Sequence, residues 1–135
     1  MAKARVKWIE DQTFMGIDAS GKGALISSGR GPGVSPMQML LLGLGGCSLV
    51  DVVIILNKQR QPFVDAEVEL EGVRGEEFPK AWENIHMHYV ITGSGLDEKR
   101  LERAIKLSVE KYCGAYATLS GVAKITYDYE VREPE

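Results

Sequence analysis

The feature that most constrains the fold is one long apolar segment, residues 36–58. Ser35 precedes it as a suitable N-cap, and Pro36 stands where a missing N–H costs nothing. Gln38 completes an S-x-x-Q capping box, and the polar run at residues 57–60 ends the segment. Roughly twenty residues at 1.5 Å each make a rod of about 30–35 Å, as long as a small domain is wide. We therefore expect a central helix over about residues 36–58.

A helix that is apolar nearly all round must be surrounded by lipid or by protein. Asp51, near the middle of this one, would cost about 2.5–3.5 kcal/mol in a bilayer, which favours protein and leaves a membrane span as the minor alternative. A chain of 135 residues does not easily wrap such a helix alone. Because most soluble oligomers are symmetric dimers, we expect two copies to bury it together as a homodimer.

Three glycines, Gly43, Gly45 and Gly46, lie inside the predicted helix. Each costs about 0.8–1 kcal/mol relative to alanine in a helix interior, so the cluster needs compensation. Close approach of another backbone or of a ligand would supply it. Local tolerance of glycine is the alternative interpretation, and the sequence leaves both open.

The rest of the chain reads as strands around a second helix. Apolar and polar residues alternate in DAEVELEG and in WENIHMHYVIT, which predicts two paired strands. Asp97 is a good N-cap for a helix that carries Cys113, with a break at Gly114 and a short helical continuation, AYATL. Further strands are expected at residues 4–9, 13–18, 23–28 and 123–131. The order β-β-β-α-β-β-α-β predicts a single α+β domain over residues 1–135, with an antiparallel sheet backing the helices.

Charge and composition exclude several classes of function. Lys and Arg number 16 against 19 Asp and Glu, a formal charge of −3, which argues against binding of nucleic acid as the main activity. The N-terminus, MAKARVKWIE, lacks the apolar h-region of a secretory signal, so we expect a cytoplasmic protein. Its two cysteines should then be thiols at rest.

No cofactor or metal site is signalled by a motif. The chain lacks the Walker A, Rossmann G-x-G-x-x-G and H-E-x-x-H patterns. His86 and His88 lie two apart on a predicted strand and share a face, which is compatible with two metal ligands. A metal site needs at least a third ligand, and none is evident. We therefore expect structural or surface histidines, and neither a metal nor a cofactor.

The remaining candidates for chemistry are Cys47 and Cys113. Both fall on the apolar sides of predicted helices, and these helices are the elements that we expect to pack together. Two cysteines on apolar stripes are either small buried hydrophobic residues or a reactive pair. The residues alone leave this choice open.

The motif SPMQMLLLGLGGCSLVDVV, taken with EKYCGAYATLSG farther along the chain, resembles the OsmC/Ohr family, named for osmotically inducible protein C and organic hydroperoxide resistance protein. The resemblance follows the order of elements along the whole chain. Its specific part is Asn or Ser followed by Pro, then Gly-Cys or Ala-Cys in a long central helix, with a second cysteine near the end of the second helix. It implies an OsmC-like fold in an intertwined homodimer, with the two long helices at the centre and each site lined by both chains.

The resemblance also implies a thiol peroxidase that reduces organic hydroperoxides. Cys47 would be the nucleophile, which attacks the peroxide and becomes a sulfenic acid. Cys113 would be the resolving thiol, which condenses with it to a disulfide that an external dithiol reduces. The implied partners are therefore a second copy of the chain, a small organic hydroperoxide and a dithiol reductant.

Four residues bear on how Cys47 would be activated. Characterised family members carry glutamate directly after the proline, where it positions an arginine; here that place is Met37, with Gln38 adjacent. Arg30, in the glycine-rich loop before the helix, is a candidate for the arginine. Asp51, one helical turn after Cys47, either opposes formation of the thiolate or serves as a buried hydrogen-bonding anchor of the dimer.

The absence of the family glutamate keeps a second function open. In this alternative the protein is a non-enzymatic OsmC-like relative that binds a small hydrophobic ligand in the apolar cleft of the dimer, with structural cysteines. Met37 in place of glutamate favours the ligand-binding function, whereas the presence of both Cys47 and Cys113 favours the peroxidase.

Overall fold

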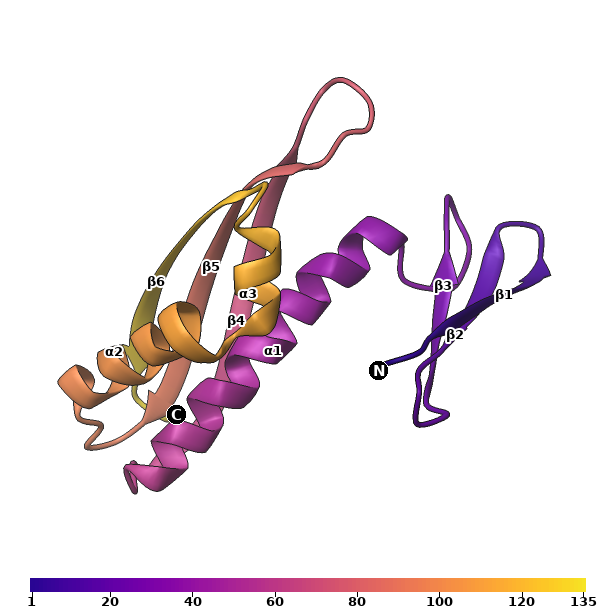
Figure 1. Cartoon of the computed structure of the whole chain (residues 1–135). Helices are drawn as coiled ribbons and strands as arrows, with labels where there is room; N and C mark the ends of the chain where they lie inside the picture. The colour runs from indigo at the N-terminus through magenta and orange to yellow at the C-terminus, as the bar shows by residue number, and fades with distance from the viewer. The chain divides into compact units, whose positions relative to one another are not determined.

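The computed structural model describes residues 1–135 and consists of two compact units, residues 1–42 and 43–135, each with its own three-stranded sheet (Figure 1). The order of elements confirms the predicted α+β fold and the short helical continuation at AYATL, and adds a π-helical turn before it. The elements are β1 (Arg5–Glu10), β2 (Thr13–Ile17), β3 (Gly23–Ser27), α1 (Pro36–Lys58), β4 (Phe63–Arg74), β5 (Trp82–Gly93), α2 (Glu98–Leu107), η1 (Ser108–Tyr112), α3 (Gly114–Leu119) and β6 (Lys124–Arg132).

The first unit contains the three strands expected near residues 4–28, and they form an antiparallel meander in which β2 pairs with both β1 and β3. The glycine-rich loop after β3 is fastened to the buried Ser27. The Ser27 hydroxyl accepts the N–H of Gly33 at 2.9 Å and lies 3.1 Å from the hydroxyl of Thr13. A Cβ at Gly31 would lie 2.5 Å from the Cβ of Ser27, so only glycine fits there. These contacts fix the loop that carries Arg30.

The second sheet is mixed, because β6 runs parallel to β5. β4 and β5 form the antiparallel pair that the alternating pattern predicts. β6 lies on the other side of β5, with Asn84 opposite Lys124 and Thr92 opposite Arg132. The expectation of an antiparallel sheet is therefore wrong for β6. The chain reaches β6 through the helical crossover from α2 to α3, and such a crossover returns the chain in the original direction.

One face of the second sheet packs against helices, as Figure 1 shows, and the other faces solvent. Burial alternates along β5 from Ile85 to Tyr89, and the buried side chains on the helix face are Ile85, Met87, Tyr89 and Ile91; Val90, on the other face, is also buried. The helices contribute Leu44, Val52, Leu56, Leu101, Ala104 and Ile105 to the same core. Full burial of each large aliphatic side chain stabilises the fold by about 1.5–3 kcal/mol. This core holds α1 and α2 on one side of the sheet.

The helix α1 covers the predicted residues and starts at the predicted cap, where the hydroxyl of Ser35 accepts the N–H of Gln38 at 3.3 Å. Within the second unit, one stripe of α1 is completely buried: Leu44, Ser48, Val52 and Leu56. The opposite stripe, called here the open stripe, is exposed and apolar: Gly43, Gly46, Val50 and Ile54. By length and composition α1 could also cross a membrane, and 33% of its most apolar window is buried within the protein.

The three glycines of α1 do not share one role. A Cβ at Gly45 would lie 2.7 Å from Cδ1 of Leu70 and 3.3 Å from Cγ1 of Val68, so this glycine lets α1 approach β4 of the same chain. A Cβ at Gly43 or Gly46 would meet nothing within 4 Å. Close approach of another backbone therefore explains Gly45, with the neighbour being the protein's own sheet.

The second helix begins at the predicted N-cap, Asp97, whose side chain accepts a backbone N–H of the first turn at 3.2 Å. From Ser108 to Tyr112 it widens into a π-helical turn, and the N–H of Cys113 donates to the carbonyl oxygen of Ser108 at 2.8 Å. Cys113 itself has an extended backbone, with φ −78° and ψ 100°. The expectation that Cys113 lies on a helix is therefore wrong by one residue: it makes the break that the sequence assigns to Gly114.

Two glutamines tie the end of α1 to the start of α2. The side-chain amide of Gln59 donates to the carbonyl oxygen of Arg100 at 2.9 Å. The amide of Gln61 donates to the carbonyl oxygen of Asp97 at 3.1 Å, and its oxygen accepts the N–H of Asp97 at 2.8 Å. These bonds fix where α2 starts beside α1, and hence where the chain arrives at Cys113.

Gly72 of β4 packs against the indole ring of Trp82. A Cβ at this position would lie 2.7 and 2.8 Å from two ring carbons, and Trp82 is buried. We expect Gly72→Ala to lower the free energy of unfolding by about 1–3 kcal/mol, the usual cost of overpacking, in urea unfolding experiments. The matched control is Gly121→Ala, whose Cβ would meet only the carbonyl oxygen of Thr118 at 3.7 Å. Equal stability of the two variants would contradict this packing.

Candidate functional site

The two cysteines lie together in the second unit. Cys47 is half-buried on α1, and Cys113 is buried between η1 and α3. Both are free thiols, and Cys47 lies near enough to raise the pKa of the Cys113 thiol. The sulfur of Cys113 also accepts the N–H of Tyr116 at 3.3 Å. The structure therefore brings together the pair that the sequence singles out, and Cys47 is the more accessible member.

The Cys113 thiol is held in its neutral form. Burial raises the pKa of this thiol to about 11, the N–H of Tyr116 lowers it, and hydrogen bonding with Cys47 and the charges of Cys47 and Asp51 raise it further. At neutral pH the group is a protonated thiol, which is not a nucleophile. The charge of Asp51 thus opposes a thiolate at Cys113, whereas its expected effect on Cys47 stays a prediction.

A chain of buried hydroxyl groups runs from the sheet to Asp51. The phenol of Tyr89 on β5 hydrogen-bonds with the hydroxyl of Ser48, which lies 2.8 Å from the hydroxyl of Ser108. Ser108 donates to Oδ2 of Asp51 at 3.0 Å. Burial raises the pKa of Tyr89 to about 12, against the opposing effect of its bond with Ser48. Because each buried group has a partner, this hydroxyl chain stabilises the junction of α1, β5 and η1.

Reasoning from the sequence missed Ser48, Tyr89 and Ser108 as parts of the site. All three are completely buried. The available signal was a serine on the apolar stripe of each helix, since a hydroxyl on a buried face needs a hydrogen-bond partner. What could not be foreseen is that the two serines are each other's partner, because they are 60 residues apart in the sequence.

An apolar groove lies next to Asp51, with a volume of about 370 Å³. It is lined by Asp51, Ile54, Ile55, Lys58, Leu107 and Tyr112. Its charged groups are one carboxylate and one ammonium, both on α1. Its size suits a small organic molecule, because ligand pockets run from roughly 300 to 1,000 Å³.

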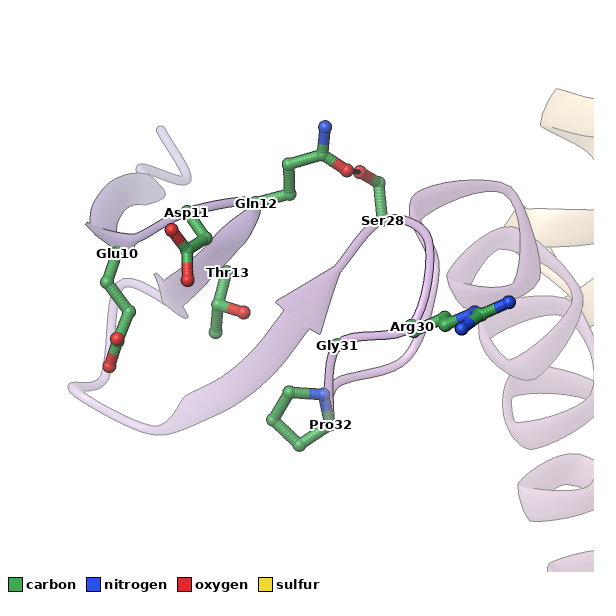
Figure 2. Close-up of a pocket in the computed structure, with 8 residues that line it drawn as sticks. All are labelled: Glu10, Asp11, Gln12, Thr13, Ser28, Arg30, Gly31 and Pro32. Carbon is green, nitrogen blue, oxygen red and sulfur yellow. Dashed lines mark hydrogen bonds between the residues drawn. The ribbon is translucent and has the colours of Figure 1, made fainter.

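Arg30 and Gln38, the other residues proposed from the sequence, lie in the first unit, and both are exposed. Arg30 belongs to a polar cleft of about 520 Å³, which Figure 2 shows. The cleft is lined by Glu10, Asp11, Gln12, Thr13, Ser28, Arg30, Gly31 and Pro32. In Figure 2 the guanidinium of Arg30 extends away from the acidic side chains of the cleft. The roles expected of Arg30 and Gln38 toward Cys47 stay predictions.

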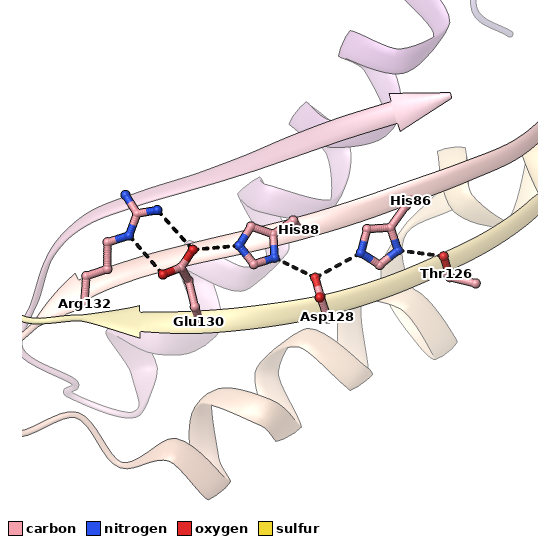
Figure 3. Close-up of polar contacts among 6 residues, drawn as sticks. All are labelled: His86, His88, Thr126, Asp128, Glu130 and Arg132. Carbon is pink, nitrogen blue, oxygen red and sulfur yellow. Dashed lines mark hydrogen bonds and ion pairs between the residues drawn. The ribbon is translucent and has the colours of Figure 1, made fainter. Parts of the chain in front are cut away.

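The two histidines belong to a row of polar side chains on the solvent face of the second sheet, called here the histidine ladder (Figure 3). Its members are His86, His88, Thr126, Asp128, Glu130 and Arg132. Oδ1 of Asp128 lies 3.0 Å from Nε2 of His86 and 2.6 Å from Nδ1 of His88. Nε2 of His88 lies 2.8 Å from Oε1 of Glu130. No group of three or more His, Cys, Asp and Glu side chains is arranged to hold a metal ion.

Comparison with known proteins gives consistent matches over nearly the whole chain. A family model described as OsmC-like protein matches residues 29–128. Protein YhfA of Escherichia coli strain K12 is 45% identical over 130 residues, which are 96% of this chain and 97% of YhfA.

Solved structures agree with this result. A hypothetical protein from Aquifex aeolicus VF5 is 35% identical, with a TM-score of 0.90 over 100% of this chain and 98% of the other. An organic hydroperoxide resistance protein OsmC from Legionella pneumophila is 15% identical, with a TM-score of 0.69 over 96% of each chain, so it shares the fold.

The histidine ladder makes stability depend on pH. The His88 ring donates hydrogen bonds to Glu130 and Asp128, which raise its pKa. The contribution of His88 to stability is therefore complete below the unfolded value near 6.5 and is lost as the pH rises through the folded value. Arg132 and then His88 lower the pKa of Glu130 to about 2, and His88 lowers that of Asp128, so their contributions are lost in acid. The stabilisation by His88 should therefore be greatest between about pH 5 and 6.5.

Thermal unfolding across a pH series, comparing wild type with His88→Gln, measures this contribution. We expect the gap in melting temperature to narrow as the pH rises from 6 to 9, roughly the range over which a histidine with a raised pKa loses its charge. Lys124→Gln, on the neighbouring strand β6 but outside the ladder, should show no such trend. A gap that widens above pH 7 would contradict the ladder's role.

Proposed function

Because the chain belongs to the OsmC-like protein family, we propose that this stress-related protein reduces organic hydroperoxides through Cys47 and Cys113. The observation that carries the proposal is the contact between a half-buried thiol on α1 and a second, buried thiol. A lone sulfenic acid is open to further oxidation, whereas one beside a second thiol is converted to a disulfide. The name of the Legionella relative, organic hydroperoxide resistance protein, agrees with the proposed substrate class.

In the proposed cycle the Cys47 thiolate attacks the terminal oxygen of the hydroperoxide. The O–O bond breaks, the sulfur becomes a sulfenic acid, and the organic part leaves as an alcohol after taking up a proton. The Cys113 sulfur then attacks the Cys47 sulfur and displaces the oxygen as water, which leaves a disulfide. A dithiol reductant restores both thiols by thiol–disulfide exchange.

Activation of Cys47 needs a cation, since a positive charge nearby favours the thiolate. We propose Arg30 for this role, because the guanidinium has no acidic side chain bonded to it and stands on a loop fixed by Ser27. Gln38, one turn into α1, is proposed to help to place that guanidinium in the way that glutamate does in family members.

We propose that a second copy of the chain covers the open stripe of α1, in a cytoplasmic homodimer. The supporting observation is that Val50 and Ile54 are 58% and 49% exposed although they lie on the central helix. Gly43 and Gly46 leave room for another backbone on the same side. The family model crosses residue 42, the limit of the first unit, which supports one domain over residues 1–135.

A ligand-binding function without thiol chemistry is the second candidate. The groove beside Asp51 favours it, because its walls are mostly apolar and its volume of about 370 Å³ suits a small hydrophobic molecule. In this function Cys47 and Cys113 would be structural residues.

Counting free thiols after treatment with cumene hydroperoxide tests the peroxidase. Reduced wild-type protein and one equivalent of the peroxide should lose both thiols together as a disulfide. Cys47→Ser should keep its remaining thiol, because the nucleophile is missing. Its reaction with the peroxide should be at least about 100-fold slower than that of the wild type. Cys113→Ser should lose its thiol to a sulfenic acid that dimedone traps. Arg30→Ala should slow the reaction of Cys47.

Two outcomes separate the candidate functions. Stoichiometric disulfide formation within seconds to minutes supports the peroxidase. Wild-type thiols that persist for hours in the presence of the peroxide would contradict it and favour the ligand-binding protein.

Light scattering on a size-exclusion column tests the dimer. The wild type should elute with twice the 14.9 kDa mass of the chain. Val50→Asp places a charge on the open stripe and should shift the protein to monomer, because an unpaired charge in an apolar interface is costly. Val122→Asp makes the same change at an exposed turn and should leave the mass unchanged. A monomeric wild type would overturn the proposed interface.

A further inference from the structure

In the second step of the proposed cycle the buried thiol of Cys113 must lose its proton. Its sulfur must act as a nucleophile, yet Cys113 is 3% exposed and neutral at rest. Water has little access to such a group, so its proton needs an acceptor within the protein. The acceptor must be a base near pH 7 and must lie at the junction of α1 and η1.

The groups around this junction leave one candidate. Tyr89 is a phenol with its pKa raised to about 12 by burial, so it keeps its proton. His86 and His88 alternate with the buried residues of β5 and therefore point to the other face of the sheet. Asp51 is a carboxylate at this junction: it is bonded to Ser108, and its charge acts on the Cys113 thiol.

Ser108 connects Asp51 with Cys113 through two different groups. Its hydroxyl donates to Oδ2 of Asp51 at 3.0 Å. Its carbonyl oxygen accepts the N–H of Cys113 at 2.8 Å, across the π-helical turn. The carboxylate and the cysteine backbone are thus both fixed to one completely buried residue. Ser108 bonds one oxygen of the Asp51 carboxylate, Oδ2. The other oxygen, Oδ1, has no hydrogen bond to a side chain.

We propose that Asp51 is the proton acceptor of the resolving step and that Ser108 is the residue that positions it. The Asp51 carboxylate takes the proton of the Cys113 thiol as the Cys113 sulfur attacks the Cys47 sulfur. The S–O bond of the sulfenic acid breaks, and the departing oxygen receives the proton from Asp51 and leaves as water. Cys113–SH and Cys47–SOH become a disulfide and one water, and Asp51 is again a carboxylate.

The proposed role gives a function to Asp51, whose charge otherwise only opposes a thiolate at Cys113. In the resting protein burial, to which the negative charge of Asp51 adds, keeps Cys113 protonated, so the resolving thiol does not react prematurely with oxidants. When Cys47 has been oxidised, the same carboxylate receives the proton. The N–H of Tyr116, which donates to the Cys113 sulfur at 3.3 Å, then stabilises the charge that develops on it.

The test separates the attack by Cys113 from the oxidation of Cys47. Asp51→Asn keeps an oxygen that accepts from Ser108 but removes the base. After one equivalent of cumene hydroperoxide, we expect the Cys47 sulfenic acid, trapped by dimedone and counted by mass spectrometry, to persist at least about 10-fold longer than in wild type, since general bases contribute roughly 10²–10⁴-fold. Asp51→Glu should recover part of the rate. Glu102→Gln, which makes the same change of carboxylate to amide at an exposed position of α2, is the matched control and should close the disulfide at the wild-type rate.

A second measurement does not depend on the proposed peroxidase function, on which this inference otherwise rests. Excess Ellman's reagent converts Cys47 into a mixed disulfide and releases one thionitrobenzoate; attack by Cys113 then releases a second and forms the Cys47–Cys113 disulfide. We expect Asp51→Asn and Ser108→Ala to slow the second release at least about 10-fold and to leave the first within about 3-fold, because only the second requires the Cys113 proton to be removed.

The outcomes distinguish the two proposals. If peroxide does not oxidise Cys47 but the second release of thionitrobenzoate depends on Asp51, the proposed peroxidase function is wrong and the proposed role of Asp51 stands. If peroxide oxidises Cys47 normally and Asp51→Asn forms the Cys47–Cys113 disulfide at the wild-type rate in both experiments, the peroxidase stands and the role of Asp51 is overturned.

Discussion

The hydrogen bond between the hydroxyls of Ser48 and Ser108 joins the two segments on which the candidate site depends. Ser48 is the neighbour of Cys47 on α1, and Ser108 opens the turn that ends at Cys113. Both hydroxyls are completely buried, so an unpaired one would cost about 1–3 kcal/mol. This requirement restricts the packing of the two helical segments to an arrangement in which the serines meet, and that arrangement also brings the sulfurs together.

The central helix and most strands could be predicted from the sequence because their signals are local. Ser35, Pro36 and Gln38 mark a helix start that depends only on residues within one turn. The same holds for the alternating pattern of β4 and β5, where the less exposed positions follow a period of two over most of each strand. The direction of β6 could not be found in this way, because a strand's side-chain pattern is the same whether its neighbour runs parallel or antiparallel.

The residues of the candidate site likewise fall into those that the sequence could predict and those that it could not. Cys47, Cys113 and Asp51 could be named from the sequence, because their residue types carry chemistry and a family motif surrounds two of them. Ser108 could not, because its importance lies in a partner 57 residues away, Asp51, and in a turn of unusual width. The extended conformation of Cys113 was also hidden, since nothing in SVEKYC departs from an ordinary helical sequence.

The π-helical turn from Ser108 to Tyr112 restricts how related sequences can diverge in length. Each residue of an α-helix turns the chain by about 100°, so deleting one residue from this turn would restore the regular pitch and rotate the following position by roughly that angle. The second cysteine would then point away from the first. A relative that is one residue shorter in this turn should therefore have lost the selective reason to keep a cysteine after it, whereas a change of length in the loop between β4 and β5 leaves the pair unaffected.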